Sequence, residues 1–197
     1  NFYIALGYRG NYIKNYFFNY NNINSDISVN LKNGIVKKLQ KPSLDWKINL
    51  INTGVNSMTG GRLKKLKKVI GKKSFFLTYG DGLSDINLKD LLNFHKKSKK
   101  MVTVTAVRPS ARFGELNISG NNVNIFKEKP QINQGWINGG FFVVEPEFLD
   151  LIDDDNTVLE KEPLEYVAKN NNLAAYKHNG FWQCMDNIRE RDYLEKL

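Results

Sequence analysis

The chain has 197 residues, with 29 basic and 20 acidic side chains and therefore a formal net charge of +9. This length allows one domain or slightly more, with a core large enough to need no disulfide or metal as a stabiliser. The single cysteine, Cys184, excludes an intrachain disulfide and any multi-cysteine metal site, which is typical of proteins in a reducing cytoplasm.

The first residues lack the basic start of a signal peptide, and no apolar run approaches the roughly 20 residues of a membrane span. We therefore expect a soluble, cytoplasmic protein without a membrane partner. Four lysines, at positions 64, 65, 67 and 68, alternate with leucine, valine and isoleucine in residues 63–70. This spacing favours a solvated helix face over a polyanion-binding patch, so we expect no nucleic-acid partner.

The first part of the chain predicts a βα pattern. Residues 2–6 form a strand candidate, and residues 11–18 a helix with Tyr12, Tyr16 and Phe17 inward. The asparagine-rich stretch 19–24 is expected to be a loop. A hairpin turn is predicted at residues 32–34, a strand over 47–52, and a helix after the paired glycines of the segment MTGGR, residues 58–62.

The segment FFLTYGDG, residues 75–82, predicts a buried parallel strand that ends at Asp81. Ligands of open α/β sheets bind beyond the carboxyl ends of strands, where an acid can hold Mg²⁺. A plain Asp-Gly turn is the alternative interpretation. Next, Asn87 is expected to cap a helix with Leu91 and His95 on one face, His95 as a packing residue more than a base.

The remainder predicts a strand over 101–107, short strands of a sheet extension over 112–127, a strand over 141–144, and a strand over 173–177. Thr157 and Glu160 suggest a capping box for the helix that carries Leu164 and Val167, and a last helix is expected over 188–197. Strands that alternate with helices indicate one α/β domain spanning residues 1–197. We expect a Rossmann-like, mostly parallel sheet with helices on both faces.

Six segments stand in a fixed order along the chain: MTGGRLK, LTYGDG, RFGEL, EKP, INGGFFV and FWQCMD. With this ordered set, the chain resembles the sugar-1-phosphate nucleotidyltransferases over nearly its whole length. Within them it is similar to those that use CTP and glucose 1-phosphate. The resemblance implies transfer of a cytidylyl group, with CDP-glucose and pyrophosphate as products, for nucleotide-sugar and surface polysaccharide synthesis. It also implies a tendency of the full-length protein to form homo-oligomers.

The resemblance further implies roles for particular residues. Asp81 and Asp186 are expected to hold Mg²⁺, which offsets the repulsion between two polyanionic substrates, about 4 kcal/mol for unit charges about 4 Å apart at a dielectric near 20. Lys129 is expected to pair with the sugar phosphate and Glu128 with sugar hydroxyls, a surface salt bridge being the alternative. The other predicted substrate contacts are Thr59, Gly60, Gly61, Arg62, Gly82, Asn138, Gly139, Gly140 and Trp182.

Two of these predicted contacts each have two possible interpretations. Arg62 would reach either a phosphate or another subunit. Trp182 would form either a wall of the sugar pocket or part of the core.

One departure from the family pattern stands out. Neither the glycine-rich GGxGTR loop that cradles the triphosphate nor the PKP lysine occurs in this sequence. We therefore expect an N-terminally truncated enzyme that lacks its first βα unit, with open sheet edges, marginal folding and deficient catalysis as it stands. Two other functions compete with this one: a metal-dependent glycosyltransferase, which would release a nucleoside diphosphate, and a non-catalytic paralogue that binds sugar nucleotides.

Overall fold

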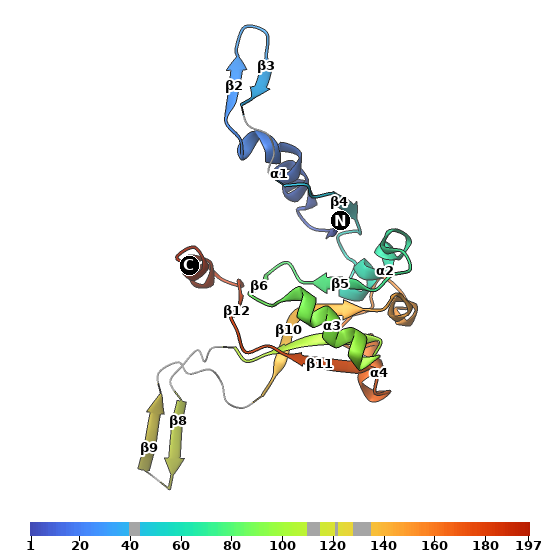
Figure 1. The fold of residues 1–197 in the computed structure, drawn as a ribbon, viewed down its shortest axis with the longest axis vertical. Helices are drawn as coiled ribbons and strands as arrows, with labels where there is room; N and C mark the ends of the chain where they lie inside the picture. The colour runs from blue at the N-terminus through green and yellow to red at the C-terminus, as the bar shows by residue number, and fades with distance from the viewer. Residues whose placement is uncertain (40–43, 110–114, 121, 128–134) are drawn as a thin grey trace. The chain divides into compact units, whose positions relative to one another are not determined.

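A computed structural model describes residues 1–39, 44–109, 115–120, 122–127 and 135–197 (Figure 1). The chain divides into two compact units. Unit 1 comprises Asn1–Gly71 and Leu149–Pro163, and unit 2 comprises Lys72–Phe148 and Leu164–Leu197. The expectation of one domain stays a prediction. Within the described residues, no helix is both long and apolar enough to cross a membrane.

Unit 1 contains a parallel strand pair, β1 (Phe2–Leu6) and β4 (Ile48–Asn52). Helix α1 (Gly10–Ile23) contacts β4, and helix α2 (Thr59–Ile70) contacts β1. The predicted hairpin is confirmed as β2 (Ile27–Asn30) and β3 (Ile35–Lys38). Its turn ends at Gly34, whose φ of 70° is a conformation that favours glycine.

Helix α1 differs from its prediction in both length and orientation. The asparagine-rich stretch is helical to Ile23, because the side chains of Asn19 and Asn24 donate to carbonyl oxygens four residues earlier and so support the last turns. Tyr12 and Tyr16, expected to point inward, are 71% and 49% exposed, and no residue of α1 is buried. The inward orientation predicted for Tyr12 and Tyr16 is therefore wrong, whereas Phe17 is partly buried.

The lysine face of α2 is partly paired. Lys64 donates to the carbonyl oxygens of Ile152 and Asp153, each at 2.6 Å, and Lys65 and Lys67 form ion pairs with Asp155 and Asp150. These contacts join α2 to the segment Leu149–Pro163 within unit 1. The expected solvated helix face is thus also a docking face for an acidic segment of the same chain.

Unit 2 is built on a four-stranded sheet in the order β11-β7-β10-β5. Its strands are β5 (Phe75–Thr78), β7 (Val102–Val107), β10 (Ile137–Val144) and β11 (Leu173–Lys177). β11 is parallel to β7, whereas β10 is antiparallel to both β7 and β5. The α/β class with a parallel-containing sheet is confirmed. The buried parallel strand predicted over 75–82 is wrong, because β5 lies at a sheet edge, antiparallel to β10, with Phe76 exposed.

Helix α3 (Leu88–Ser98) covers this sheet and supplies much of its core. As predicted, the Asn87 side chain caps the helix by accepting hydrogen bonds from the backbone amides of Lys89 and Asp90. Leu91 is fully buried, and so is His95, whose ring nitrogens lie 2.8 Å from Thr103 Oγ1 and 2.9 Å from Glu145 Oε1. The central strands β7 and β10 contribute fully buried valines and Phe142.

Smaller elements complete unit 2. β6 (Gly82–Ser84) pairs antiparallel with β12 (Trp182–Cys184). β8 (Glu115–Ser119) pairs antiparallel with β9 (Asn122–Lys127) as a two-stranded sheet, which confirms short strands within 112–127, and residues 112–114 lie outside the described residues. The chain ends with α5 (Ile188–Leu194).

The capping box is not formed. Helix α4 (Glu162–Lys169) begins later in the chain. Thr157 Oγ1 instead donates to Asp154, and Glu160 accepts a hydrogen bond from Thr59. A 3₁₀ turn, Pro146–Leu151, follows β10.

Candidate active site

The two predicted metal ligands lie close together in unit 2. The β6–β12 ladder pairs Gly82 with Cys184, and the amide of Met185 donates to the carbonyl oxygen of Asp81 at 2.9 Å. Asp81 therefore faces the residue directly before Asp186 across the ladder, although the two acids are distant in sequence. Both side chains are exposed to solvent. The ladder thus brings the backbones of Asp81 and Asp186 close together beyond the carboxyl end of β5, and their sharing of one metal ion stays a prediction.

Predicted sugar-contacting residues gather at the same edge of the sheet. The indole nitrogen of Trp182 donates to the carbonyl oxygen of Gly139 at 2.7 Å. Asn138 accepts a hydrogen bond from the amide of Gly140 at 2.9 Å and donates to the hydroxyl of Tyr79 at 3.4 Å. Because β5 ends where β10 begins, these groups come from the same end of the sheet as Asp81.

The glycines at this edge also have packing roles. A Cβ on Gly139 would lie 2.7 Å from Val107 Cγ1, and one on Gly140, which has φ of 78°, would lie 2.8 Å from Tyr79 Cδ2. Gly82 is less confined, since its added Cβ would meet its nearest atoms, including the Trp182 indole nitrogen, at 3.9 Å. Close backbone packing by itself therefore requires Gly139 and Gly140, and their contact with a sugar stays a prediction.

Glu190 is a neighbour of Asp186 that sequence reasoning missed. It is buried, and its Oε2 accepts a hydrogen bond from the backbone amide of Asp186 at 2.7 Å. The ligand atoms of Cys184, Asp186 and Glu190 lie within 4.8 Å of one another. The signal in the sequence was the cap of α5, where Asn187 accepts from the Glu190 amide, a spacing typical of capping boxes.

Cys184 is a neutral neighbour of the Asp186 carboxylate. Its thiol lies 3.5 Å from Asp186 Oδ2, to which it donates. Burial, and then the hydrogen bond to Asp186, raise the pKa of the Cys184 thiol. The thiol is therefore protonated at neutral pH, and the groups that fit a cation here are carboxylate oxygens. Exposed carboxylates from two adjacent strands suit Mg²⁺, which prefers oxygen ligands and keeps several waters.

Asp85, the next acid after Asp81, has a separate role. Its Oδ1 lies 2.8 Å from Nε2 of His178, and a Cβ on Gly180 would lie 2.5 Å from the same oxygen. The pair fixes the chain just before β12, since the Asp85 amide also donates to the carbonyl oxygen of Phe181. Asp85 thus supports the segment that leads to Trp182 and Asp186.

In unit 1, the predicted contacts of the MTGGR segment bind other parts of that unit. The amides of Gly60 and Gly61 both donate to the carbonyl oxygen of Thr157, at 3.0 and 3.3 Å. Thr59 Oγ1 donates to Glu160 at 2.7 Å and accepts from the amide of Leu159 at 2.9 Å. The two glycine amides therefore already have an acceptor, and contact of this segment with base and ribose stays a prediction.

Arg62 is held in the same way. Its guanidinium donates to Thr53 Oγ1 at 3.0 Å and to the carbonyl oxygens of Gly54 and Val55 at 2.9 and 3.2 Å. These bonds fix the loop after β4, and contact of Arg62 with a phosphate or another subunit stays a prediction.

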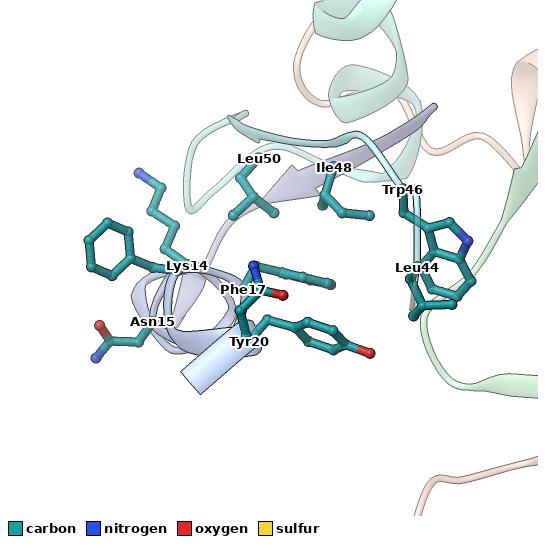
Figure 2. A pocket seen from close by; sticks show the side chains of 10 residues that line it. Lys14, Asn15, Phe17, Tyr20, Leu44, Trp46, Ile48 and Leu50 are labelled. Atoms are coloured by element: carbon teal, nitrogen blue, oxygen red, sulfur yellow. The ribbon is translucent and has the colours of Figure 1, made fainter. Parts of the chain in front are cut away.

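Unit 1 also carries a hollow that contains none of the predicted site residues. Its volume is about 710 Å³. Figure 2 shows Phe17 and Tyr20 of α1 on one side and Leu44, Trp46 and Ile48 on the other. Its walls are thus mainly aromatic and aliphatic.

The predicted ligands Glu128 and Lys129 lie outside the described residues.

Comparison with known proteins points to one family. A family model described as nucleotidyl transferase matches residues 25–187. The glucose-1-phosphate cytidylyltransferase of Salmonella typhi is 43% identical over 197 residues, which is 100% of this chain and 77% of that protein. The probable glucose-1-phosphate cytidylyltransferase of Bacillus subtilis is 40% identical with the same coverage. The crystal structure of HddC from Yersinia pseudotuberculosis has the same fold, with a TM-score of 0.66 at 18% identity over 98% of this chain and 77% of that one.

Proposed function

Because the chain belongs to the nucleotidyl transferase family, we propose that it transfers a cytidylyl group from CTP to glucose 1-phosphate, with release of CDP-glucose and pyrophosphate. The observation that carries the proposal is the 43% identity, over the whole chain, with a glucose-1-phosphate cytidylyltransferase. The neighbouring positions of Asp81, just before β6, and Asp186, just after β12, support it.

In this reaction a phosphate oxygen of glucose 1-phosphate forms a bond to the α-phosphorus of CTP, and the bond from that phosphorus to the pyrophosphate oxygen breaks. No covalent enzyme intermediate is required, so the side chains act by positioning and by neutralising charge. A magnesium ion held by Asp81 and Asp186 would supply positive charge to the phosphate oxygens.

The other residues of the strand edge orient the sugar. We assign Asn138, Gly139, Gly140 and Trp182 to its binding, with Gly82 leaving room beside the Trp182 indole. Glu128 is assigned to sugar hydroxyls and Lys129 to the sugar phosphate. In unit 1, the segment Thr59 to Arg62 is assigned to base and ribose.

The test replaces each acid with its neutral isostere. Asp81→Asn and Asp186→Asn are each expected to lower the rate of pyrophosphate release from CTP and glucose 1-phosphate by roughly 10²-fold or more, because each removes stabilisation of phosphoryl charge. Mn²⁺ binding, followed by electron paramagnetic resonance, gives a second readout that does not need turnover. Both variants are expected to bind Mn²⁺ more weakly than the parent chain.

Asp90→Asn is the matched control, since Asp90 is an exposed acid of unit 2 in the first turn of α3. It should retain both turnover and Mn²⁺ affinity. Parent-level Mn²⁺ binding and turnover in the Asp81 or Asp186 variant would refute the metal assignment. The expectation that the chain turns over poorly by itself stays a prediction, and the Mn²⁺ readout remains decisive in that case.

The reaction products distinguish the competing functions. Pyrophosphate from CTP, with less from UTP or other triphosphates, supports a cytidylyltransferase. Release of a nucleoside diphosphate from a nucleotide sugar would instead indicate a glycosyltransferase. Binding of CDP-glucose with neither release would indicate a non-catalytic paralogue.

A further inference from the structure

Trp136, directly before β10, lies beneath two cationic groups. The guanidinium carbon of Arg108 is 4.4 Å from the centroid of the indole ring, and the Lys177 ammonium nitrogen is 5.4 Å from it. Arg108 directly follows β7, and Lys177 is the last residue of β11. Arg108, Trp136 and Lys177, here called the cation–indole cluster, thus lie at the ends of three neighbouring strands of the unit 2 sheet.

Strand register puts this cluster on the same face as a predicted sugar contact. Lys177 and Asn138 both pair with Ala106, from opposite sides of β7. Paired residues of adjacent strands share a face, as do residues two positions apart along a strand. Arg108 lies two positions after Ala106 and Trp136 two before Asn138, each one residue outside its strand. Their contacts with the Trp136 ring join Arg108 and Lys177, so the cluster lies on the Asn138 side at the carboxyl ends of β7 and β11.

The charges of the cluster have no acidic partner in the part of the chain that the structure describes. Neither Arg108 nor Lys177 forms an ion pair there. The Arg108 Nε atom is buried and has no hydrogen-bond acceptor among the described residues. A buried donor without an acceptor is costly, and in native proteins its acceptor is often a ligand, water or ion. Two cations held by one ring also repel each other until an anion joins them.

From these contacts we infer that the cation–indole cluster is an anion subsite for a phosphate group of the substrates. A guanidinium matches the oxygens of a phosphate in a fork, and an ammonium adds a point charge beside it. The cluster lies at the sheet edge where ligands of such folds bind, next to Asn138. It is separate from the acids at the β6–β12 ladder, because none of its members belongs to that ladder. The identity of the phosphate as a substrate group rests on the proposed function.

The test uses the ring itself as a reporter. The chain has three tryptophans, Trp46, Trp136 and Trp182, so the part of a fluorescence change that Trp136→Phe abolishes belongs to Trp136. Inorganic pyrophosphate, glucose 1-phosphate and CTP are titrated separately into the full chain. At least one is expected to change the Trp136 emission. The arm that responds at the lowest concentration identifies the source of the phosphate group.

Charge removal tests the two cations. Lys177→Gln and Arg108→Gln are each expected to lower the affinity for the responding anion about tenfold, because each loses a charge-assisted contact. The double variant should lower this affinity further. Lys97→Gln, on an exposed turn of α3, removes the same charge elsewhere in unit 2 and should leave the affinity unchanged. If Arg108→Gln fails to fold, Lys177→Gln alone decides, since Lys177 is exposed.

The inference would be overturned if no anion changes the Trp136 emission, or if the double variant binds the anion as tightly as the parent. Cytidylyl transfer with an unchanged KM for both substrates in the double variant would also overturn it, while leaving the proposed function intact. Conversely, anion binding that depends on Arg108 and Lys177 in a chain that releases no pyrophosphate would support the subsite and count against the proposed function.

Discussion

Helices α1 and α3 are both rich in large apolar side chains, yet only one of them is part of a core. In α3, Leu91 is 0% and His95 is 1% exposed. In α1 no residue is buried, and Phe18 is 86% exposed. The main strand contact of α1 is β4, whereas α3 contacts three adjacent strands, β7, β10 and β11. The width of the sheet beneath a helix, more than the composition of the helix, decides how much apolar surface is buried.

This difference also separates two kinds of stabilisation. α3 stabilises unit 2 by apolar burial and by the hydrogen bonds of His95 to Thr103 and Glu145. Unit 1 also buries apolar side chains, among them Leu63 and Leu66 of α2, and adds polar contacts between α2 and the segment Leu149–Pro163, such as those of Lys64 and Thr59. Substitutions in α3 and at the contacts of α2 should therefore lower the free energy of unfolding by different amounts.

The largest loss is expected for Leu91→Ala in α3. The leucine is fully buried against the sheet, so truncation removes apolar contacts and leaves a cavity. The free energy of unfolding, from urea denaturation, should fall by about 2–5 kcal/mol. A loss below about 1 kcal/mol would show that the α3 interface relaxes freely and that the contrast with α1 is mistaken.

A smaller loss is expected for Gly61→Ala in α2. The added Cβ would lie 2.4 Å from the carbonyl oxygen of Asp155, so the segment Leu149–Pro163 has to move away. We expect the free energy of unfolding to fall by about 1–3 kcal/mol. Gly80→Ala is the control, because its Cβ would meet no atom of the described residues within 4 Å. Equal stability of the two variants would mean that this segment docks loosely.

Almost no loss is expected for Phe18→Ala in α1. An exposed side chain leaves no cavity when truncated, so the free energy of unfolding should change by less than about 0.5 kcal/mol. The same urea titration measures it beside Leu91→Ala. A loss comparable to that of Leu91→Ala would indicate that α1 is covered by another chain in solution, and analytical ultracentrifugation of both variants would then test for that assembly.

Local features of the fold were predictable where the cause is local. The turn before Gly34 and the Asn87 cap follow from turn and capping chemistry within a few residues. The orientation of α1 was not, because helical periodicity identifies an apolar face but does not tell whether a wide enough sheet covers it. The direction of β5 likewise depends on its partner β10, which lies far along the chain.

The candidate site shows the same limit. Asp81 could be found as an acid at the end of an apolar run, and Asp186 as an acid before a helix. Their proximity depends on the β6–β12 ladder, a long-range pairing that only the family resemblance anticipated. Arg108 and Lys177 carried no signal at all, since their common contact with Trp136 arises from the order of strands in the sheet.

The β6–β12 ladder also constrains how this region tolerates change in length. Successive side chains of a strand alternate between faces, so a shift of one position reverses the side to which each points. Deleting Met185, for example, would put Asp186 in the place opposite Asp81 and so change the spacing between the two acids. Insertions and deletions in related sequences are therefore expected at the tip of the β2–β3 hairpin. They should be nearly absent from the paired strands β6 and β12 and from the step to Asp186.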